Sequence, residues 1–300
     1  MSSRCAVVRG IGEMRKARDR ARRAGRSVSF VPTMGCLHEG HLSLVDLARR
    51  HADEVVLSIY VNPAQFGDGE DLDEYPRDLE RDLELAAARG VDVVFAPSDA
   101  EMYPEPQTIW VEPPEEMARR LCGLSRPTHF RGVLTVVLKL FEIVQPDVAV
   151  FGRKDYQQAV LIRRMVRELQ LAVRIETAPI ARESDGVAMS SRNEYLTADG
   201  RLAADGRPAA RALSGALMAV RAAFRAGERS GRVLGEKARS VMQEAGVRVE
   251  YAEIVDADDL SPASEADRSD ICVVAGHVGS TRLIDNAPLA GSCSLDDPEE

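Results

Sequence analysis

The chain has few of the features that mark secreted, membrane-spanning or disulfide-built proteins. Its five cysteines are scattered over 300 residues and form no CxxC pair, which argues against a disulfide framework and against a zinc site. The best apolar run, residues 133–144, is interrupted by Lys139 and Glu142 and is shorter than the ~18 residues that a membrane helix needs. No apolar block near the N-terminus is long enough for a secretory signal. We therefore expect a cytoplasmic protein with reduced thiols.

Positive charge is also scarce. The 39 Lys and Arg residues are outnumbered by 48 Asp and Glu, for a net charge of −9, which argues against nucleic acid as a partner. The one basic run, residues 15–26, is interrupted by Asp19 and is typical of a solvated helix face. The apolar fraction of 45% is ordinary for a soluble globular protein, and 300 residues favour two domains. We expect small molecules as substrates and no membrane partner.

The first 180 residues alternate short β-branched runs with helical patterns. Apolar periodicity predicts helices over residues 40–50 and around residues 159–169. Strands that are apolar on both faces and alternate with helices indicate a parallel sheet covered on both sides. In such α/β folds, ligands bind beyond the carboxyl ends of the strands. The predicted strands are residues 27–33, 54–61, 91–97, 147–152 and 173–180.

The pattern changes after residue 180. Ala/Arg-rich helical patterns cover residues 198–226 and 231–244, and strand patterns follow at 247–255 and 271–278. This predicts a smaller α+β domain over residues 181–289, after a first domain over residues 1–180. The small, acidic tail over residues 290–300 is predicted to be disordered.

The clearest chemical motif follows the first predicted strand, where His38 and His41 lie on either side of Gly40. A spacing of three places both imidazoles on one helix face, and a helix N-terminus offers backbone N–H groups to a phosphate. Gly40 leaves room for a nucleotide against the backbone, and imidazole can offset charge that builds on phosphorus. A chance pair of histidines and a metal site are the alternatives, although HEGH lacks the HExxH spacing and no third ligand is evident.

Five segments resemble, in order and spacing, the motifs of the pantothenate synthetase family. They are PTMGCLHEGHLSLV (32–45), VNPAQFGDGEDLDEYPRDLERDL (61–83), RPTHFRGVLTVVLKLFEIVQPDVAVFGRKDYQQ (126–158), RESDGVAMSSRNEYL (182–196) and GSTRLIDN (279–286). The likeness is dense over residues 28–200 and weaker elsewhere, apart from the last segment. The family belongs to the HxGH nucleotidyltransferase-like group, so the resemblance implies a Rossmann-like parallel sheet, a C-terminal lid domain and a homodimer.

The resemblance also implies an ATP-dependent condensation of pantoate with β-alanine. In that reaction a pantoyl-adenylate forms, and pyrophosphate and AMP are released. His41, His38 and Lys154 are expected to stabilise the transferring phosphorus. Pantoate is a small carboxylate with two hydroxyls, which suits the amide groups of Gln65, Gln158 and Asn62.

The resemblance implies further contacts with ATP and its metal. Asp82 is expected to help place Mg²⁺, because ATP enters as its magnesium complex. Four positions depart from the family pattern without removing a chemical group that the mechanism needs: Cys36, Thr128, Arg153 and Ala181. The expected ATP contacts are Met34, Gly35, His38, Gly40, His41, Arg126, Gly152, Lys154, Asp155, Ala181, Met189, Ser190, Ser191 and Arg192.

Structural interpretations stay open for several of these residues. Gln65 suits an ordinary surface-loop amide, and Lys154 with Asp155 suits an exposed ion pair. Ser190 or Ser191 can cap a helix, and the acidic run that contains Asp82 suits a solvated helix face.

Two other functions also stay open. A nucleotidyltransferase that moves AMP onto a phosphorylated substrate would share the HxGH motif but would not need the amides of Gln65 and Gln158. A nucleotide-binding regulator would bind ATP without turnover. Such a regulator is disfavoured by the presence together of His38, His41, Lys154 and Arg192.

Overall fold

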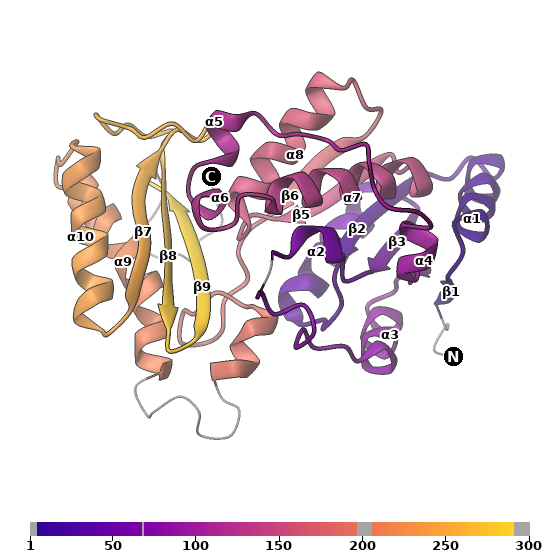
Figure 1. The fold of residues 1–300 in the computed structure, drawn as a ribbon, viewed down its shortest axis with the longest axis horizontal. Helices are drawn as coiled ribbons and strands as arrows, with labels where there is room; N and C mark the ends of the chain where they lie inside the picture. Colours follow the sequence, from indigo (N-terminus) through magenta and orange to yellow (C-terminus); the bar gives the residue numbers. More distant parts are fainter. Residues whose placement is uncertain (1–4, 68, 197–205, 291–300) are drawn as a thin grey trace. The chain divides into compact units, whose positions relative to one another are not determined.

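The computed structural model describes residues 5–67, 69–196 and 206–290, and it divides the chain into two compact units. The first unit is Met1–Arg153 with Gln157–Ala178, and the second is Lys154–Tyr156 with Pro179–Glu300. Figure 1 shows the elements of both units along the chain. Among the described residues, no helix is both long enough and apolar enough to span a membrane.

The first unit is built on a six-stranded parallel sheet, which confirms the predicted α/β class. The spatial order of the strands is β1-β4-β3-β2-β5-β6. The strands are β1 (Ala6–Val8), β2 (Val28–Thr33), β3 (Glu54–Ile59), β4 (Val93–Phe95), β5 (Val148–Gly152) and β6 (Arg174–Ala178). The last five of these fall on the predicted runs. The central strands read as continuous apolar runs because both of their faces are buried, with a core that includes Val31, Leu57 and Val150.

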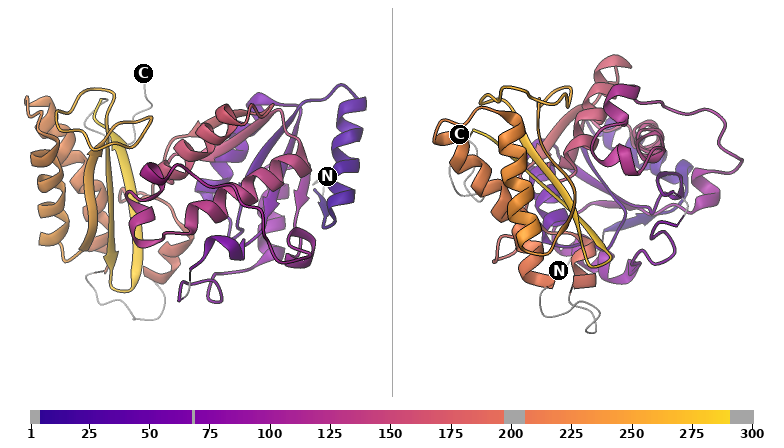
Figure 2. Two further views of the ribbon diagram at one scale, coloured as in Figure 1. Left: turned by 45° about the horizontal axis from the view of Figure 1, so that its top comes forward. Right: turned by 60° about the vertical axis from the view of Figure 1, so that its left-hand side comes forward.

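Helices cover both faces of this sheet. With this strand order, right-handed crossovers place α2 and α3 on one face and α1, α7 and α8 on the other. Figure 2 shows the helices and strands of this unit in two further views. The long helices of this unit are α1 (Ile11–Arg23), α2 (Glu39–His51), α3 (Leu79–Ala88), α7 (His129–Val144) and α8 (Tyr156–Glu168). Short helices lie in the connections: α4 (Asp99–Met102), α5 (Glu115–Ala118), α6 (Cys122–Ser125) and the 3-10 turn η1 (Pro63–Gln65).

The strand order sets the place of a ligand site. From β2 the chain runs outward through β3 and β4 in one direction, and β5 and β6 lie on the other side of β2. The carboxyl ends of β2 and β5 therefore meet at the topological switch point, where open α/β sheets bind ligands.

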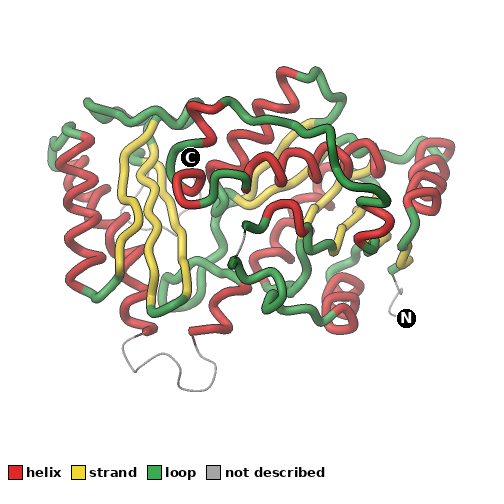
Figure 3. Tube along the Cα trace, viewed as in Figure 1, coloured by secondary structure: helices red, strands yellow, loops and turns green. Residues whose placement is uncertain are grey.

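The second unit is a three-stranded antiparallel sheet with two helices packed against it (Figure 3). Its elements are the 3-10 helix η2 (Ser191–Leu196), α9 (Gly206–Arg225), α10 (Gly231–Glu244), β7 (Arg248–Val255), β8 (Ile271–Val278) and β9 (Thr281–Pro288). The core between sheet and helices includes Leu217, Leu234 and Val274. The predicted helix start at residue 198 and most of the predicted tail, residues 291–300, lie outside the described residues.

A buried ion pair explains part of the motif GSTRLIDN. Arg182 and Asp285 pair at 2.7 Å with side chains that are only 5% and 2% exposed. The next residue, Asn286, donates from Nδ2 to the carbonyl of Lys154 at 3.0 Å. The second unit therefore brings together segments from three of the motifs that the sequence placed far apart.

Candidate active site

A tight turn connects β2 to α2. The Thr33 hydroxyl donates to the carbonyl of Ser58 at 2.7 Å and accepts from the Gly35 N–H at 3.1 Å. Gly35 has a φ of +83°, and a Cβ at this position would lie 2.8 Å from Oδ2 of Asp82. The turn therefore depends on a glycine at position 35, because an L side chain would be strained and would clash.

Asp82 of α3 holds this turn from within the protein. Its side chain is buried, at 1% exposure, and its two oxygens accept the backbone N–H groups of Cys36 at 2.8 Å and Leu37 at 2.7 Å. Burial raises the pKa of Asp82, and the two backbone hydrogen bonds oppose that rise. The interpretation of this position as part of a solvated helix face is wrong, because the carboxylate is buried and supports the turn.

The two histidines meet at the start of α2. His38 is the N-cap residue, and its Nδ1 accepts from the Gly40 N–H at 3.1 Å, so neutral His38 carries its proton on Nε2. The rings of His38 and His41 have centroids 4.0 Å apart. Both imidazoles therefore lie at the first turn of a 13-residue helix, where N–H groups and the helix dipole favour an anion.

An amide cluster follows β3. Asn62 is 1% exposed, and its Nδ2 donates to Oε1 of Gln65 at 3.2 Å and to the carbonyl of Gly132 at 3.3 Å. The Nε2 of Gln65 in turn donates to the sulfur of Met34 at 3.1 Å. Gln65 is thus part of a network that joins the turns after β2 and β3, and is not an isolated surface amide.

Arg126 lies on the backbone side of Gln65. It donates to the Gln65 carbonyl at 3.3 Å, and the Nδ1 of His129 lies 2.8 Å from the same oxygen. Arg126 also pairs with Glu70, with 2.7 Å between Nε and Oε1. Burial disfavours the ionised form of Glu70, but the hydrogen bonds and charge of Arg126 outweigh it and hold the pKa of Glu70 below its ordinary value. The contact of Arg126 with ATP stays a prediction.

The two glutamines at the start of α8 have different surroundings. Gln157 is buried and accepts from the Cys122 N–H at 3.1 Å. Its Nε2 donates to the carbonyls of Met117 at 2.8 Å and Arg120 at 2.9 Å. Gln158 is only partly buried, so it is the member of the pair that suits a substrate. Gly152, the remaining predicted contact of this unit, ends β5.

The other predicted ATP contacts belong to the second unit: Lys154, Asp155, Ala181, Met189, Ser190, Ser191 and Arg192. The Met189 N–H donates to the Ala181 carbonyl at 2.9 Å, and the Ser190 hydroxyl accepts from the Arg192 N–H at 3.2 Å. That second bond is of the kind that caps a helix, in agreement with the structural interpretation of Ser190. The ATP contacts of these residues stay predictions.

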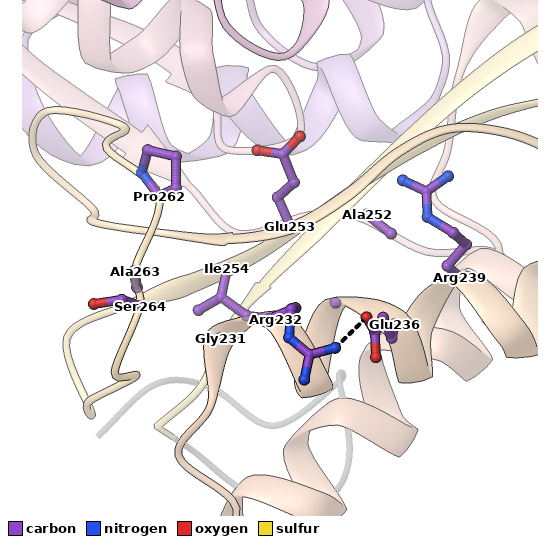
Figure 4. Close-up of a pocket in the computed structure, with 11 residues that line it drawn as sticks. Gly231, Arg232, Glu236, Arg239, Ala252, Glu253, Ile254, Pro262, Ala263 and Ser264 are labelled. Carbon is purple, nitrogen blue, oxygen red and sulfur yellow. Dashed lines mark hydrogen bonds and ion pairs between the residues drawn. The ribbon is translucent and has the colours of Figure 1, made fainter.

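The described part of the chain includes two hollows of similar volume. One of about 400 Å³ lies in the first unit, at the carboxyl ends of β2, β3 and β4, and its walls include Met34, Gly35 and Asp82. The other, of about 420 Å³, lies in the second unit between α10, β7 and residues 262–264, with Arg232 and Glu236 paired beside it (Figure 4). None of the predicted site residues lines the second hollow, so the candidate site is the edge of the parallel sheet.

Comparison with known proteins identifies the family. The family model for pantoate-beta-alanine ligase matches residues 6–288. The chain belongs to the pantoate-beta-alanine ligase family. This membership confirms the resemblance and the interpretation of the chain as an ATP-dependent acid–amino-acid ligase. Because the family is one of ligases, this membership argues against a nucleotide-binding regulator that lacks turnover.

Curated relatives match over nearly their whole length. The pantothenate synthetase of Pelobacter propionicus is 52% identical over 288 residues, which are 96% of this chain and 99% of the relative. That of Acidothermus cellulolyticus is 52% identical over 294 residues, covering 96% of this chain and 93% of the relative. The matched residues therefore include both units of the structure.

Solved structures of this family share the fold. The pantothenate synthetase of Thermus thermophilus aligns with a TM-score of 0.88 at 42% identity, over 95% of this chain and 100% of that chain. The pantoate-beta-alanine ligase of Francisella tularensis aligns with a TM-score of 0.77 at 32% identity, over 97% of this chain and 100% of that chain. The Francisella protein was solved in complex with beta-gamma ATP and beta-alanine.

Proposed function

We propose that this chain activates pantoate with ATP and transfers the acyl group to β-alanine. The observation that carries the proposal is the direct link between the two halves of the site. Met34, at the start of the turn that leads to the HxGH histidines, accepts a hydrogen bond from Gln65 of the amide cluster at 3.1 Å. A phosphate site and a set of amides suited to a small hydroxy acid therefore adjoin at the switch point of the sheet.

The chemistry follows from the low reactivity of a carboxylate toward an amine. A carboxylate oxygen of pantoate attacks the α-phosphorus of ATP, the bond to the β-phosphate oxygen breaks, and pyrophosphate leaves. The amine of β-alanine then attacks the acyl carbon, the bond to AMP breaks, and the amine loses a proton. His38 and His41, with Lys154, stabilise the charge on phosphorus in the first step, and positioning supplies much of the remaining rate.

Magnesium is expected to arrive with ATP and to be held mainly by phosphates and water. Among the described residues, no group of three or more His, Cys, Asp or Glu side chains is arranged to hold a metal ion. Asp82 is poorly suited to bind Mg²⁺ as a dedicated ligand, because each of its oxygens already accepts a hydrogen bond from a backbone N–H group. We therefore assign no catalytic step to a protein-bound ion.

The assembly and location of the protein are further parts of the proposal. We propose a homodimer in the cytoplasm, on the basis of the family resemblance and of the scattered cysteines. Light scattering coupled to size exclusion measures the dimer directly, and a monomer at micromolar concentration would contradict it.

Product analysis tests the proposed function. Incubation with ATP, Mg²⁺, pantoate and β-alanine is expected to yield AMP, pyrophosphate and an amide in equal amounts. Without β-alanine, the enzyme is expected to exchange labelled pyrophosphate into ATP when pantoate is present, because the adenylate forms before the amine is needed. Exchange that requires β-alanine would contradict the two-step scheme. A protein that forms no pyrophosphate from this mixture, but releases pyrophosphate when a phosphorylated acceptor is added, would favour a nucleotidyltransferase instead.

A further inference from the structure

Tyr103 contacts the amide cluster from a distant part of the chain. It follows α4, which lies after β4, and its hydroxyl donates to Oδ1 of Asn62 at 2.7 Å. The two residues are separated by 41 positions in the sequence. This O–H···O bond has its usual length, whereas the N–H bonds that join the Asn62 side chain to Ala64, Gln65 and Gly132 are at or beyond the upper end of theirs. The Tyr103 hydroxyl therefore contributes most to the orientation of the Asn62 side chain.

The partners of Asn62 determine which way its amide points. Gly132 offers a carbonyl, which can only accept, and Ala64 offers a backbone N–H, which can only donate. The Nδ2 group must therefore face Gly132 and Gln65, and Oδ1 must face Ala64 and Tyr103. The bond from Ala64 is long, at 3.4 Å, so the Tyr103 hydroxyl is the stronger donor to Oδ1.

The orientation of Asn62 passes to Gln65. Because Nδ2 of Asn62 donates to Oε1 of Gln65 at 3.2 Å, the carbonyl end of the Gln65 amide faces Asn62. The NH₂ end faces Met34 at the turn after β2. Gln65 thus presents donors on the side of the proposed site, which suits a carboxylate or hydroxyl oxygen of the substrate.

The Tyr103 ring is itself held in place. The Lys139 ammonium lies 4.0 Å from the ring centroid and donates to Oε1 of Gln107 at 3.1 Å, a cation–π contact that restrains the ring. Burial and the charge of Asp99 raise the pKa of Tyr103 to about 12. The phenol therefore keeps its proton, and remains a donor to Asn62, throughout the neutral range.

We propose that Tyr103 is a positioning residue for the pantoate site, which acts through Asn62 to keep the NH₂ end of Gln65 turned toward the substrate. This inference rests on the proposed function, because it assigns pantoate to Gln65. It concerns the binding of pantoate and not the transfer of the adenylyl group from ATP. Loss of such an interaction is expected to raise KM more than it lowers kcat.

Tyr103→Phe tests the inference, since it removes the hydroxyl and keeps the ring under Lys139. We expect the KM for pantoate to rise about fivefold to tenfold, as for the loss of one buried hydrogen bond, with kcat within about twofold and the KM for ATP unchanged. Tyr251→Phe is the matched control, because Tyr251 is also a buried tyrosine but belongs to β7 of the second unit and lines neither the candidate site nor the amide cluster. It should leave both KM values unchanged.

A double-mutant cycle separates this role from a structural one. In an Asn62→Ala background the hydroxyl has lost its acceptor, so Tyr103→Phe should cause no further loss of kcat/KM for pantoate. A full additional loss, an equal rise in the KM for ATP, or an unchanged KM for pantoate in Tyr103→Phe would overturn the inference.

Calorimetric titration of the same variants with pantoate keeps this test apart from that of the proposed function. A wild-type protein that binds pantoate but forms no amide would contradict the proposed function alone. Wild type and Tyr103→Phe that bind pantoate equally well, or a wild type that binds none, would overturn the role of Tyr103.

Discussion

Replacing His41 with alanine should slow pyrophosphate formation from ATP and pantoate by a factor of about 10² to 10³, the usual loss for one donor to a transition state. His41 lies in the first turn of α2, with its ring 4.0 Å from that of His38. The loss should appear in kcat, because the charge on phosphorus builds only as the bond to pyrophosphate breaks. Rapid-quench measurement of a single turnover isolates this step.

His51→Ala is the matched control for this prediction. His51 is the last residue of the same helix, α2, at the end remote from the turn after β2. The substitution removes an identical side chain, so it should leave the single-turnover rate within about twofold. Both variants should unfold at the wild-type temperature within a few degrees. A His41→Ala protein with a near-normal rate would show that the histidine pair does not act on phosphorus.

Replacing Asp82 with alanine should slow the same step by about 30-fold to 100-fold. The substitution leaves the buried N–H groups of Cys36 and Leu37 without the acceptors that they have now, at a cost of about 1–3 kcal/mol for each group left unsatisfied. The turn that carries the HxGH histidines would then lose its anchor, and misplacement by about 1 Å can cost about 10²-fold in rate. The single-turnover assay measures the loss, and thermal unfolding measures the accompanying destabilisation.

Two comparisons show how Asp82 acts. Glu80→Ala removes an exposed carboxylate from the same helix and should have little effect, so equal rates for the two variants would refute the anchoring role. Raising the Mg²⁺ concentration distinguishes anchoring from metal binding. A magnesium ligand predicts that excess Mg²⁺ restores the rate of Asp82→Ala, whereas an anchor for the turn predicts no recovery.

Local patterns in the sequence determined most of the parallel sheet. Residues 55–57 and 148–151 are apolar on consecutive positions, because strands covered by helices on both sides bury both faces. The apolar pattern did not predict β1, because this strand has only three residues and two of them are exposed. It also failed for β9, whose residues 281–286 were recognised as a motif but not as a strand.

The candidate site also has one part that the sequence determined and another that depended on the tertiary structure. The sequence alone determined the histidine pair, because His38 and His41 are neighbours on one turn of a helix, and their spacing is a local property. Only the tertiary structure decided which residues hold the site in place. Asp82 lies 45 positions from Leu37, Tyr103 lies 41 from Asn62, and Gln157 lies 35 from Cys122. A hydrogen bond between such residues depends on how strands and helices pack, and no local pattern of residue types records which distant backbone group or amide a buried side chain will meet.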